Sequence, residues 1–578
     1  MIPAVSEYAV DGVPLLRSAP VAGRTVATLT FRVGRFDEPL PAAGITHMVE
    51  HLTFAGRPRP SYTFNASVSG LYTTFVMDSA DPADVADFVG AVCAGLTADA
   101  SGQLDRERVV LRTEAASRGG AGALGQCLAE RYGAAGPGVA NYLEFALRHA
   151  SWADVEAWRR RWFTAGNAVL TVAGEVPDGL RVSLPDGPAM RPRPVAPMDL
   201  ALPGFAVAGG GGIGLSMVAP RSVAAAATNA ILHERLTKVL RYENGLTYNV
   251  QSIGEALDDA LAHSWIAADA LAEQRAVVAH TMLTTFEELI DVGCDRAEID
   301  AYASRLREMY ADGPTAPLVL LMRRSTDLLT GRTTPAPEES LKLATELDPR
   351  AVRDTAQALY DQLIVATPTS IPAVQGRMGT LSAWSARSVS GRPRTSVDSD
   401  AALTMGDEGA TLTIEPGRHE PAHCATVRYD SAVALVRWKN ARQVLIGTDG
   451  FSIQLDADEW PDGERVLAEV AARVDPAIVV PLDTEGGPRP GRGKTAAEPD
   501  VQAQAATAGQ AATRSRRRRW RLTRWGIRTF AVLLIAFGVT PAARSIGPLM
   551  VVAGTSLLLR FEYRLSKARR QARRRRAT

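Results

Sequence analysis

The 578-residue sequence has little cysteine, no sign of a secretory leader and no apolar run of ordinary membrane-spanning length. The MIPAVSEYAV start lacks both the basic and the apolar region of a secretory signal, so we expect none. The few cysteines are far apart and form no C-x-x-C pair, which excludes a disulfide framework and a thiolate metal site and fits a reducing compartment. They are Cys93, Cys127, Cys294 and Cys424.

The charges are unevenly distributed along the chain. The formal net charge is only +1, yet the stretch from Arg514 to the end holds 18 Lys and Arg and a single acid, Glu562. An acidic body is therefore joined to a basic tail. The apolar content of 46% and the charged content of 22% are globular values. The length predicts about three or four domains.

The stretch Gly44 to Phe54, GITHMVEHLTF, contains the pattern H-x-x-E-H. On a helix, residues three and four apart share a face, so His47, Glu50 and His51 are expected to point into one small volume. Neutral imidazoles suit Zn²⁺, and a carboxylate one turn away can take a proton from a bound water. Two surface histidines on an ordinary helix are the alternative. This inverted zinc motif predicts a catalytic metal site that still needs a third ligand.

A second candidate helix follows near Leu104 to Arg118, LDRERVVLRTEAASR. Its Glu107 and Glu114 are seven residues apart and hence share one face. Either could reach the metal. The alternative is a solvated, charged helix whose acids pair with the neighbouring arginines.

The motifs around this pattern resemble one family, the insulinase/pitrilysin metallopeptidases, which include the mitochondrial processing peptidases. The resemblance rests on HMVEH, on the approach to it through Gly34, Glu38 and Gly44, on the NAS strand at Asn65, and on the helix with two glutamates seven apart. It covers roughly residues 5 to 370.

The resemblance implies a role for each matching residue. His47, His51 and Glu114 would bind one Zn²⁺ per chain, Glu50 would be the general base and Glu107 a supporting acid near the reaction. Asn65 and Ala66 would bind substrate. His51 and Glu114 are 63 positions apart, fewer than is usual in the family.

A second unit begins near residue 201, where the pattern of strand, long helix, strand and further helices restarts. Its RYENGLTY turn holds Arg241 and Tyr248, which match a family pair that binds the substrate backbone and the oxyanion. The alternative is an Arg at a helix C-terminus and a Tyr in a strand. We expect an α+β fold, with residues 1–200 and 201–370 as two repeated mixed α/β peptidase units. They would form half of a clamshell that a homodimer completes.

The family resemblance ends near residue 370. Residues 371–405, rich in Ser, Arg and Gly, are expected to be a linker. Between 406 and 482, short strands followed by one amphipathic helix resemble a pleckstrin-homology-like barrel with a C-terminal helix. No side-chain motif there indicates its ligand.

The last part of the chain carries the expected membrane anchor. Residues 483–513 are expected to be a disordered linker. Residues 514–578 hold two 15-residue apolar stretches between arginine runs, Thr529–Ala543 and Ser545–Leu559. As helices they would span about 22 Å against a hydrocarbon core of about 30 Å, which a locally thinned bilayer can accommodate. We expect a transmembrane helical hairpin, with an interfacial or re-entrant anchor as the alternative. Basic residues at both outer ends place the peptidase in the cytoplasm and favour membrane lipids over nucleic acid.

These patterns predict a membrane-anchored zinc endopeptidase that acts on peptides or unfolded protein segments. The alternative is a weakly active or inactive peptide-binding scaffold tethered to the membrane. Glu50 distinguishes the two, because a binder without catalysis has no need of a general base.

Overall fold

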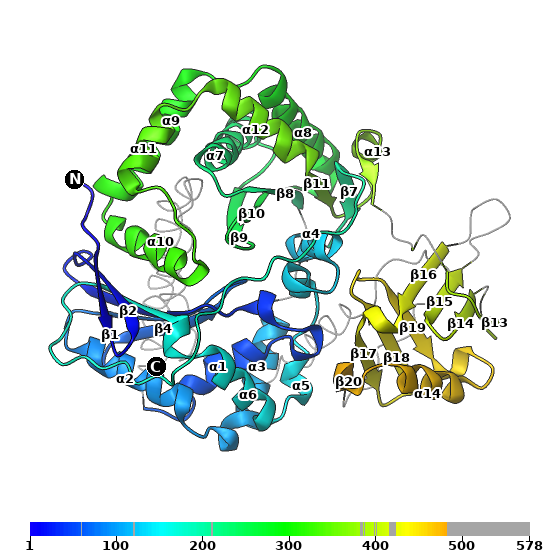
Figure 1. Cartoon of the computed structure of the whole chain (residues 1–578). Coiled ribbons are helices and arrows are strands. Elements are labelled where there is room, and N and C mark those ends of the chain that lie inside the picture. The colour runs from blue at the N-terminus through cyan, green and yellow to red at the C-terminus, as the bar shows by residue number, and fades with distance from the viewer. Residues whose placement is uncertain are drawn as a thin grey trace, which may run out of the picture.

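The structure is a computed structural model that describes residues 1–482, apart from positions 59, 119–121, 210–211, 382–384, 386–387, 398, 400 and 415–422. Two similar α/β units lie one above the other, and a smaller β-rich domain lies beside them (Figure 1). The expected linker 483–513 and hairpin 514–578 lie outside the described residues. Within the described part, no helix combines the length and the apolar character that crossing a bilayer requires.

The first unit is built on a six-stranded sheet in the order β1-β2-β6-β3-β5-β4. β2 and β6 run parallel and the other neighbours are antiparallel. The first hairpin turns at Asp11 and Gly12. Their φ values of 49° and 80° are positive, as such a tight turn requires, and Asp and Gly adopt positive φ more readily than most residues. The strands are β1 (Ser6–Val10), β2 (Val13–Ser18), β3 (Thr25–Phe31), β4 (Thr63–Val68), β5 (Thr73–Ser79) and β6 (Ala168–Ala173).

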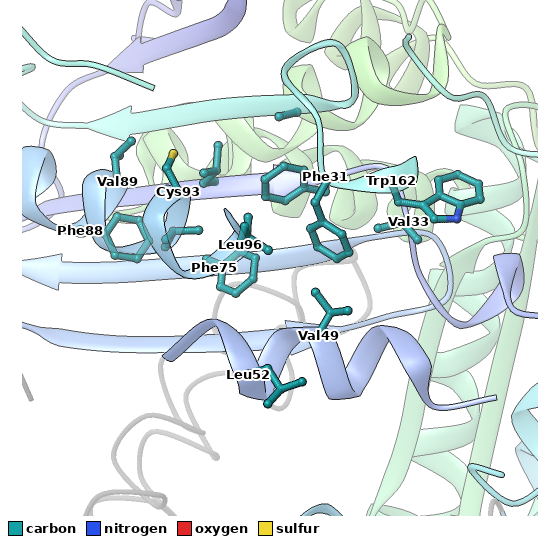
Figure 2. Packing of buried hydrophobic residues seen from close by; sticks show 14 of the residues in the cluster. Phe31, Val33, Val49, Leu52, Phe75, Phe88, Val89, Cys93, Leu96 and Trp162 are labelled. Carbon is teal, nitrogen blue, oxygen red and sulfur yellow. The ribbon is translucent and has the colours of Figure 1, made fainter. Parts of the chain in front are cut away.

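Helices cover one face of this sheet and enclose its core. Phe31 and Phe75 cross at nearly a right angle with ring centroids 6.1 Å apart, and Val49 of α1 is directed at them (Figure 2). Because eight of the ten residues of α1 are buried, the helix that carries H-x-x-E-H is rigidly enclosed. The helices are α1 (Ile45–Phe54), α2 (Asp84–Thr97), α3 (Leu104–Arg118), α4 (Gly122–Tyr132), α5 (Ala146–His149) and α6 (Trp152–Trp162).

The second unit repeats the topology of the first. Its sheet has the order β12-β7-β11-β8-β10-β9, so β7, β8, β9, β10 and β11 take the places of β2, β3, β4, β5 and β6. The first and last of these strands, β7 and β11, again run parallel; β12, in the place of β1, also runs parallel to its neighbour β7. The strands are β7 (Gly204–Val207), β8 (Gly212–Pro220), β9 (Val250–Ala256), β10 (Leu261–Asp269), β11 (Ile364–Thr367) and β12 (Gly379–Thr380).

The helices of the second unit complete the repeat, since α7 follows β8 as α1 follows β3. The pattern expected from residue 201 onward therefore corresponds to a real structural repeat. The helices are α7 (Val223–Thr237), α8 (Arg275–Asp291), α9 (Arg296–Arg307), α10 (Ala316–Thr330), α11 (Pro337–Thr345), α12 (Pro349–Asp361) and α13 (Pro372–Gln375).

The two units exchange helices across their interface. α4 of the first unit lies against the second sheet, where Arg131 donates to the carbonyl oxygen of Ser216 at 2.7 Å and Cys127 packs beside Ile364. In return, Leu321 and other residues of α10 pack on the outer face of the first sheet. Each sheet thus has one face covered by the sequence of the other unit.

The smaller domain differs from the expected barrel. Its strands form two separate four-stranded sheets, β13-β14-β15-β16 and β19-β18-β17-β20. Its helix α14 (Gly463–Arg473) is not terminal, because β20 follows it and pairs in parallel with β17. The strands are β13 (Arg392–Thr395), β14 (Ala401–Met405), β15 (Gly409–Ile414), β16 (His423–Arg428), β17 (Ala432–Trp438), β18 (Arg442–Gly447), β19 (Ser452–Asp456) and β20 (Val479–Leu482).

The expectation that residues 371–405 are only a linker is wrong. β12 adds to the sheet of the second unit, whereas β13 and β14 belong to the smaller domain. The Ser-, Arg- and Gly-rich composition did not indicate these strands, of which β12 and β14 pair with β7 and β15 outside the segment.

Candidate metal centre

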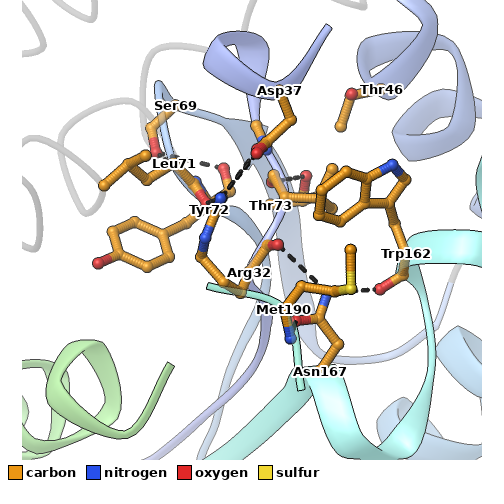
Figure 3. A network of polar contacts seen from close by, with 12 residues as sticks. Arg32, Asp37, Thr46, Ser69, Leu71, Tyr72, Thr73, Trp162, Asn167 and Met190 are labelled. Atoms are coloured by element: carbon orange, nitrogen blue, oxygen red, sulfur yellow. Dashed lines mark hydrogen bonds and ion pairs between the residues drawn. The ribbon is translucent and has the colours of Figure 1, made fainter. Parts of the chain in front are cut away.

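A buried ion pair fixes the loop that leads into α1. Arg32, directly after β3, holds both carboxylate oxygens of Asp37 at 2.7 and 2.8 Å and also donates to the carbonyl oxygen of Leu71 (Figure 3). The exposed fractions of the two side chains are 1% and 7%. Removing one partner would leave a buried charge unpaired, so the pair holds the loop in one conformation.

Glu38, the next residue, caps the N-terminus of α1. Its two carboxylate oxygens accept hydrogen bonds from the backbone N–H groups of Gly44 and Thr46 at 2.7 and 2.9 Å. These are donors that the first turn of a helix leaves without internal partners. Burial raises the pKa of Glu38 to about 7, although the bonds from Thr46 and Gly44 and the charge of Arg35 favour its ionised form. The start of the helix is therefore fixed.

Each imidazole of α1 has a carboxylate at its Nδ1 atom. Nδ1 of His51 lies 3.3 Å from Glu107 Oε2, and Nδ1 of His47 lies 3.2 Å from Glu144 Oε1. Carboxylates that hold the Nδ1–H of a histidine orient its ring and leave Nε2 as the free ligand atom. Both rings are therefore turned to present Nε2.

The two Nε2 atoms converge on the carboxylates of Glu50 and Glu114. Glu114 Oε2 lies 3.4 Å from His51 Nε2 and 3.8 Å from His47 Nε2, and Glu50 Oε2 lies 3.7 and 3.8 Å from His47 and His51 Nε2. Two ligand atoms bound to a tetrahedral zinc ion are about 3.4 Å apart. The two imidazoles and Glu114 fit a three-ligand site with one open position, and His47, Glu50 and His51 also satisfy the geometry of a cation cluster.

The electrostatics of the cluster favour a cation. Burial opposes the charged form of His51, but the carboxylates of Glu114, Glu50 and Glu107 outweigh it and raise the pKa of this imidazole to about 9. The same acids would stabilise a divalent ion in the place of the proton.

The spacing on α3 explains why both of its glutamates take part. Seven residues are two helical turns, so Glu107 and Glu114 project from one face, and α3 lies beside α1. Glu107 reaches the Nδ1 side of His51 and Glu114 the Nε2 side. The structure thus brings together five of the residues selected from sequence, in the register that the shortened interval implied.

The remaining candidates lie on two other elements. Asn65 and Ala66 are in β4, which is the edge strand of the first sheet. Arg241 lies in a π-helical turn after α7, with its guanidinium 5.4 Å from the ring centroid of Tyr248. This pair belongs to the second unit and the metal cluster to the first. Tyr248 is 72% exposed.

Sequence reasoning missed Glu144. It lies just before α5, 97 positions from His47, in a segment without amphipathic periodicity. Arg35 Nη2 lies 3.9 Å from the same carboxylate. No local pattern connects Glu144 with the histidine, because only the tertiary fold brings them together.

The repeated units, their strand order and the position of the H-x-x-E-H helix define the half-clamshell fold of M16-type peptidases. No protein-family model and no curated protein sequence matches the chain. Solved structures do match it in fold.

A protease from Helicobacter pylori superposes with a TM-score of 0.51 at 14% identity, covering 63% of this chain and 99% of that one. An M16 peptidase inactive domain from Pseudomonas fluorescens has a TM-score of 0.52 at 16% identity, with 64% and 98% covered. The periplasmic protease PqqL from Escherichia coli has a TM-score of 0.50 at 14% identity, with 77% and 55% covered. At these identities the likeness establishes the fold and leaves the chemistry to the residues of the site.

The contrasting contacts of the two α3 glutamates predict contrasting variants. Glu114→Gln should weaken Zn²⁺ binding about 100-fold or more because it removes a charged ligand atom. Glu107→Gln should weaken it about tenfold, because an amide still accepts a hydrogen bond from His51 Nδ1–H. Competition with a chromogenic chelator measures both constants. Equal losses in the two variants would contradict the assignment of Glu114 to the Nε2 side.

Proposed function

We propose that the chain is a zinc-dependent endopeptidase of the insulinase/pitrilysin type that cleaves peptides or unfolded protein segments. The observation that carries this proposal is the convergence of His47 Nε2, His51 Nε2 and Glu114 around one position, with Glu50 beside it. Carboxylates on the Nδ1 atoms of both rings support the same assignment, since they are the usual outer partners of histidine ligands.

The residues around this position suit peptide hydrolysis. A bound Zn²⁺ would polarise the carbonyl group of the scissile bond and lower the pKa of a bound water. Glu50, held on rigid α1, would take the proton of that water and return it to the leaving amine. The hydroxyl of Tyr248 would donate to the developing oxyanion, and Arg241, stacked on the same ring, would hold the tyrosine and contact the substrate backbone.

An extended peptide would bind along β4. As the edge strand of the first sheet, β4 has backbone groups of Asn65 and Ala66 available for pairing with another strand. Such pairing reads the backbone and not the side chains, which suits a substrate that is unfolded and of varied sequence. It also requires a chain without stable structure of its own.

A second candidate function is peptide binding without efficient cleavage. It is favoured by the likeness to the Pseudomonas fluorescens structure, which is described as an inactive domain. Glu50 argues against it, because a carboxylate adjacent to both Nε2 atoms is needed for proton transfer and not for binding.

The decisive comparison is between Glu50→Gln and the unmodified protein. The variant should retain Zn²⁺ and lose activity on an unstructured peptide library by about 100-fold or more, because an amide cannot accept the proton. Glu156→Gln, on the exposed surface of α6 in an ion pair with Arg160, is the matched control and should keep full activity. Wild-type protein that contains no zinc, or cleavage that is unchanged in Glu50→Gln, would refute the proposal that the protein is a zinc-dependent endopeptidase.

We further propose that the working unit is a homodimer in which one protomer's metal site faces its partner's second unit. The helix exchange through α4 and α10 holds the two units of a chain in one arrangement, so the second unit is not free to fold over its own metal site. On Arg241's ring partners and on the edge strand β9, three large side chains are exposed to 69%, 72% and 44%, as expected for a surface that meets a partner. They are Tyr242, Tyr248 and Ile253.

Complementation tests this shared site. Glu50→Gln and Arg241→Ala proteins are each expected to be nearly inactive alone, whereas purified mixed dimers should show up to about half of wild-type activity, because one of their two sites has both intact halves. The dimers are separated by two different affinity tags before the assay. Purified mixed dimers as inactive as either parent would rule the model out.

The C-terminal residues 514–578 are proposed as the membrane anchor, with the peptidase in the cytoplasm. The support is their sequence alone: two apolar stretches between arginine clusters. The full chain should pellet with membranes and resist carbonate extraction, whereas a chain ending at residue 482 should remain in the supernatant. In sealed inverted vesicles, added protease should degrade the body of the protein; its protection there would contradict the orientation.

A further inference from the structure

The smaller domain docks on the first unit through one face of its strands β17, β18 and β20. Along β17 and β18 the side chains alternate: Leu435 and Leu445 enter the domain's own core, while Val436 and Ile446 point to the peptidase. A strand exposed on one side would carry polar residues there, so a sheet that is apolar on both faces is built to be covered on both. Figure 1 shows β17 and β20 next to α5 of the first unit.

A tight turn adds polar contacts at the edge of this interface. The carbonyl oxygen of Thr448, in the β18–β19 turn, accepts from the N–H of Ala134 at 2.9 Å. Gly133 permits this approach, because a Cβ there would lie 2.1 Å from that oxygen. Gly133 also has a φ of +61°, which suits glycine.

The docked face holds the short segment that carries Glu144. Its neighbours Leu143 and Phe145 pack in the interface cluster with Val436 and Ile446, and the exposed fraction of Phe145 is 1%. With both neighbours directed at the smaller domain, the side chain of Glu144 projects in the other direction, toward His47.

The segment is also tied to the start of the metal helix. Ala146 N–H donates to the carbonyl oxygen of Ala43 at 2.9 Å. Gly44, at the start of α1, has a φ of +90°, and a Cβ there would lie 2.5 Å from the Cβ of Glu144. Ala43 and Leu40 themselves pack against the smaller domain. One interface therefore braces both the loop that leads into α1 and the carboxylate that orients His47.

We infer that Glu144 is a positioning residue for the metal ligand His47, and that the docked smaller domain keeps it in place. The domain thereby acts as a structural part of the metal centre, although none of its described residues belongs to the metal cluster. This inference rests on the proposed zinc site. Zn²⁺ affinity, and not only activity, should therefore depend on the contacts between the Glu144 segment and the smaller domain.

The test compares zinc affinities of full-length proteins by chelator competition, starting from metal-free samples. Glu144→Ala should weaken Zn²⁺ binding about 10- to 100-fold. Val436→Asp, which places a charge in the docked face, should weaken it by a similar factor. The double variant should lose little more than either single variant, because both changes act through the same carboxylate.

A milder substitution and its control test whether misfolding, and not loss of the domain contact, lowers the zinc affinity. Gly133→Ala should push the Thr448 turn away and lower zinc affinity severalfold. Gly293→Ala is its matched control: it also follows a helix, has a φ of +85° and would place its new Cβ with no atom within 4 Å, so it introduces the same backbone strain without touching the smaller domain. Hydrogen exchange of metal-free protein should rise around residues 143–146 in Gly133→Ala only.

The outcomes separate the two proposals. Wild-type protein that binds no zinc would overturn the proposed function and this inference with it. Zinc binding that is normal in wild type and within about twofold of it in Glu144→Ala or Val436→Asp would overturn this inference alone. Losses that multiply fully in the double variant would likewise show that the domain does not act through Glu144.

Discussion

The direction in which the two imidazole rings of α1 point is the constraint on which the site depends. A helix with H-x-x-E-H places both rings on one face but leaves each ring free to present either nitrogen. Glu107 from α3 and Glu144 from the segment before α5 occupy the two Nδ1 atoms, so both Nε2 atoms meet Glu114 and Glu50. The packing of the surrounding elements on α1 therefore decides the chemistry of the cluster as much as the motif does.

Much of the fold and site was accessible from sequence because it depends on local periodicity. The spacing of three and four within α1, and of seven between Glu107 and Glu114, follows from helical geometry alone. The predicted helix from Leu104 to Arg118 has the same bounds in the structure. The repeat was recognisable since each unit uses the same succession of strand, helix and hairpin.

Other features could not be predicted because they depend on contacts between distant segments. Glu144 lies in a stretch without regular periodicity, and only the fold brings it to His47. The strands between 371 and 405 have compositions typical of a linker, and two of them, β12 and β14, pair with β7 and β15 elsewhere in the chain. The doubly apolar β17 and β18 were visible as strands, but a barrel was expected since a single sequence does not reveal what covers a second apolar face.

The exchange of α4 and α10 between the units also bears on how the chain is made. When β6 emerges at Ala173, the first sheet still exposes the face that Leu321 will cover, and that helix ends only at Thr330. At a synthesis rate of about 5 to 20 residues per second, this face of the sheet stays uncovered for roughly 10 to 30 seconds before α10 is complete. A nascent chain of this length therefore exposes an apolar sheet face until α10 has been made, and the sequence boundary near residue 200 does not separate two independently packed cores.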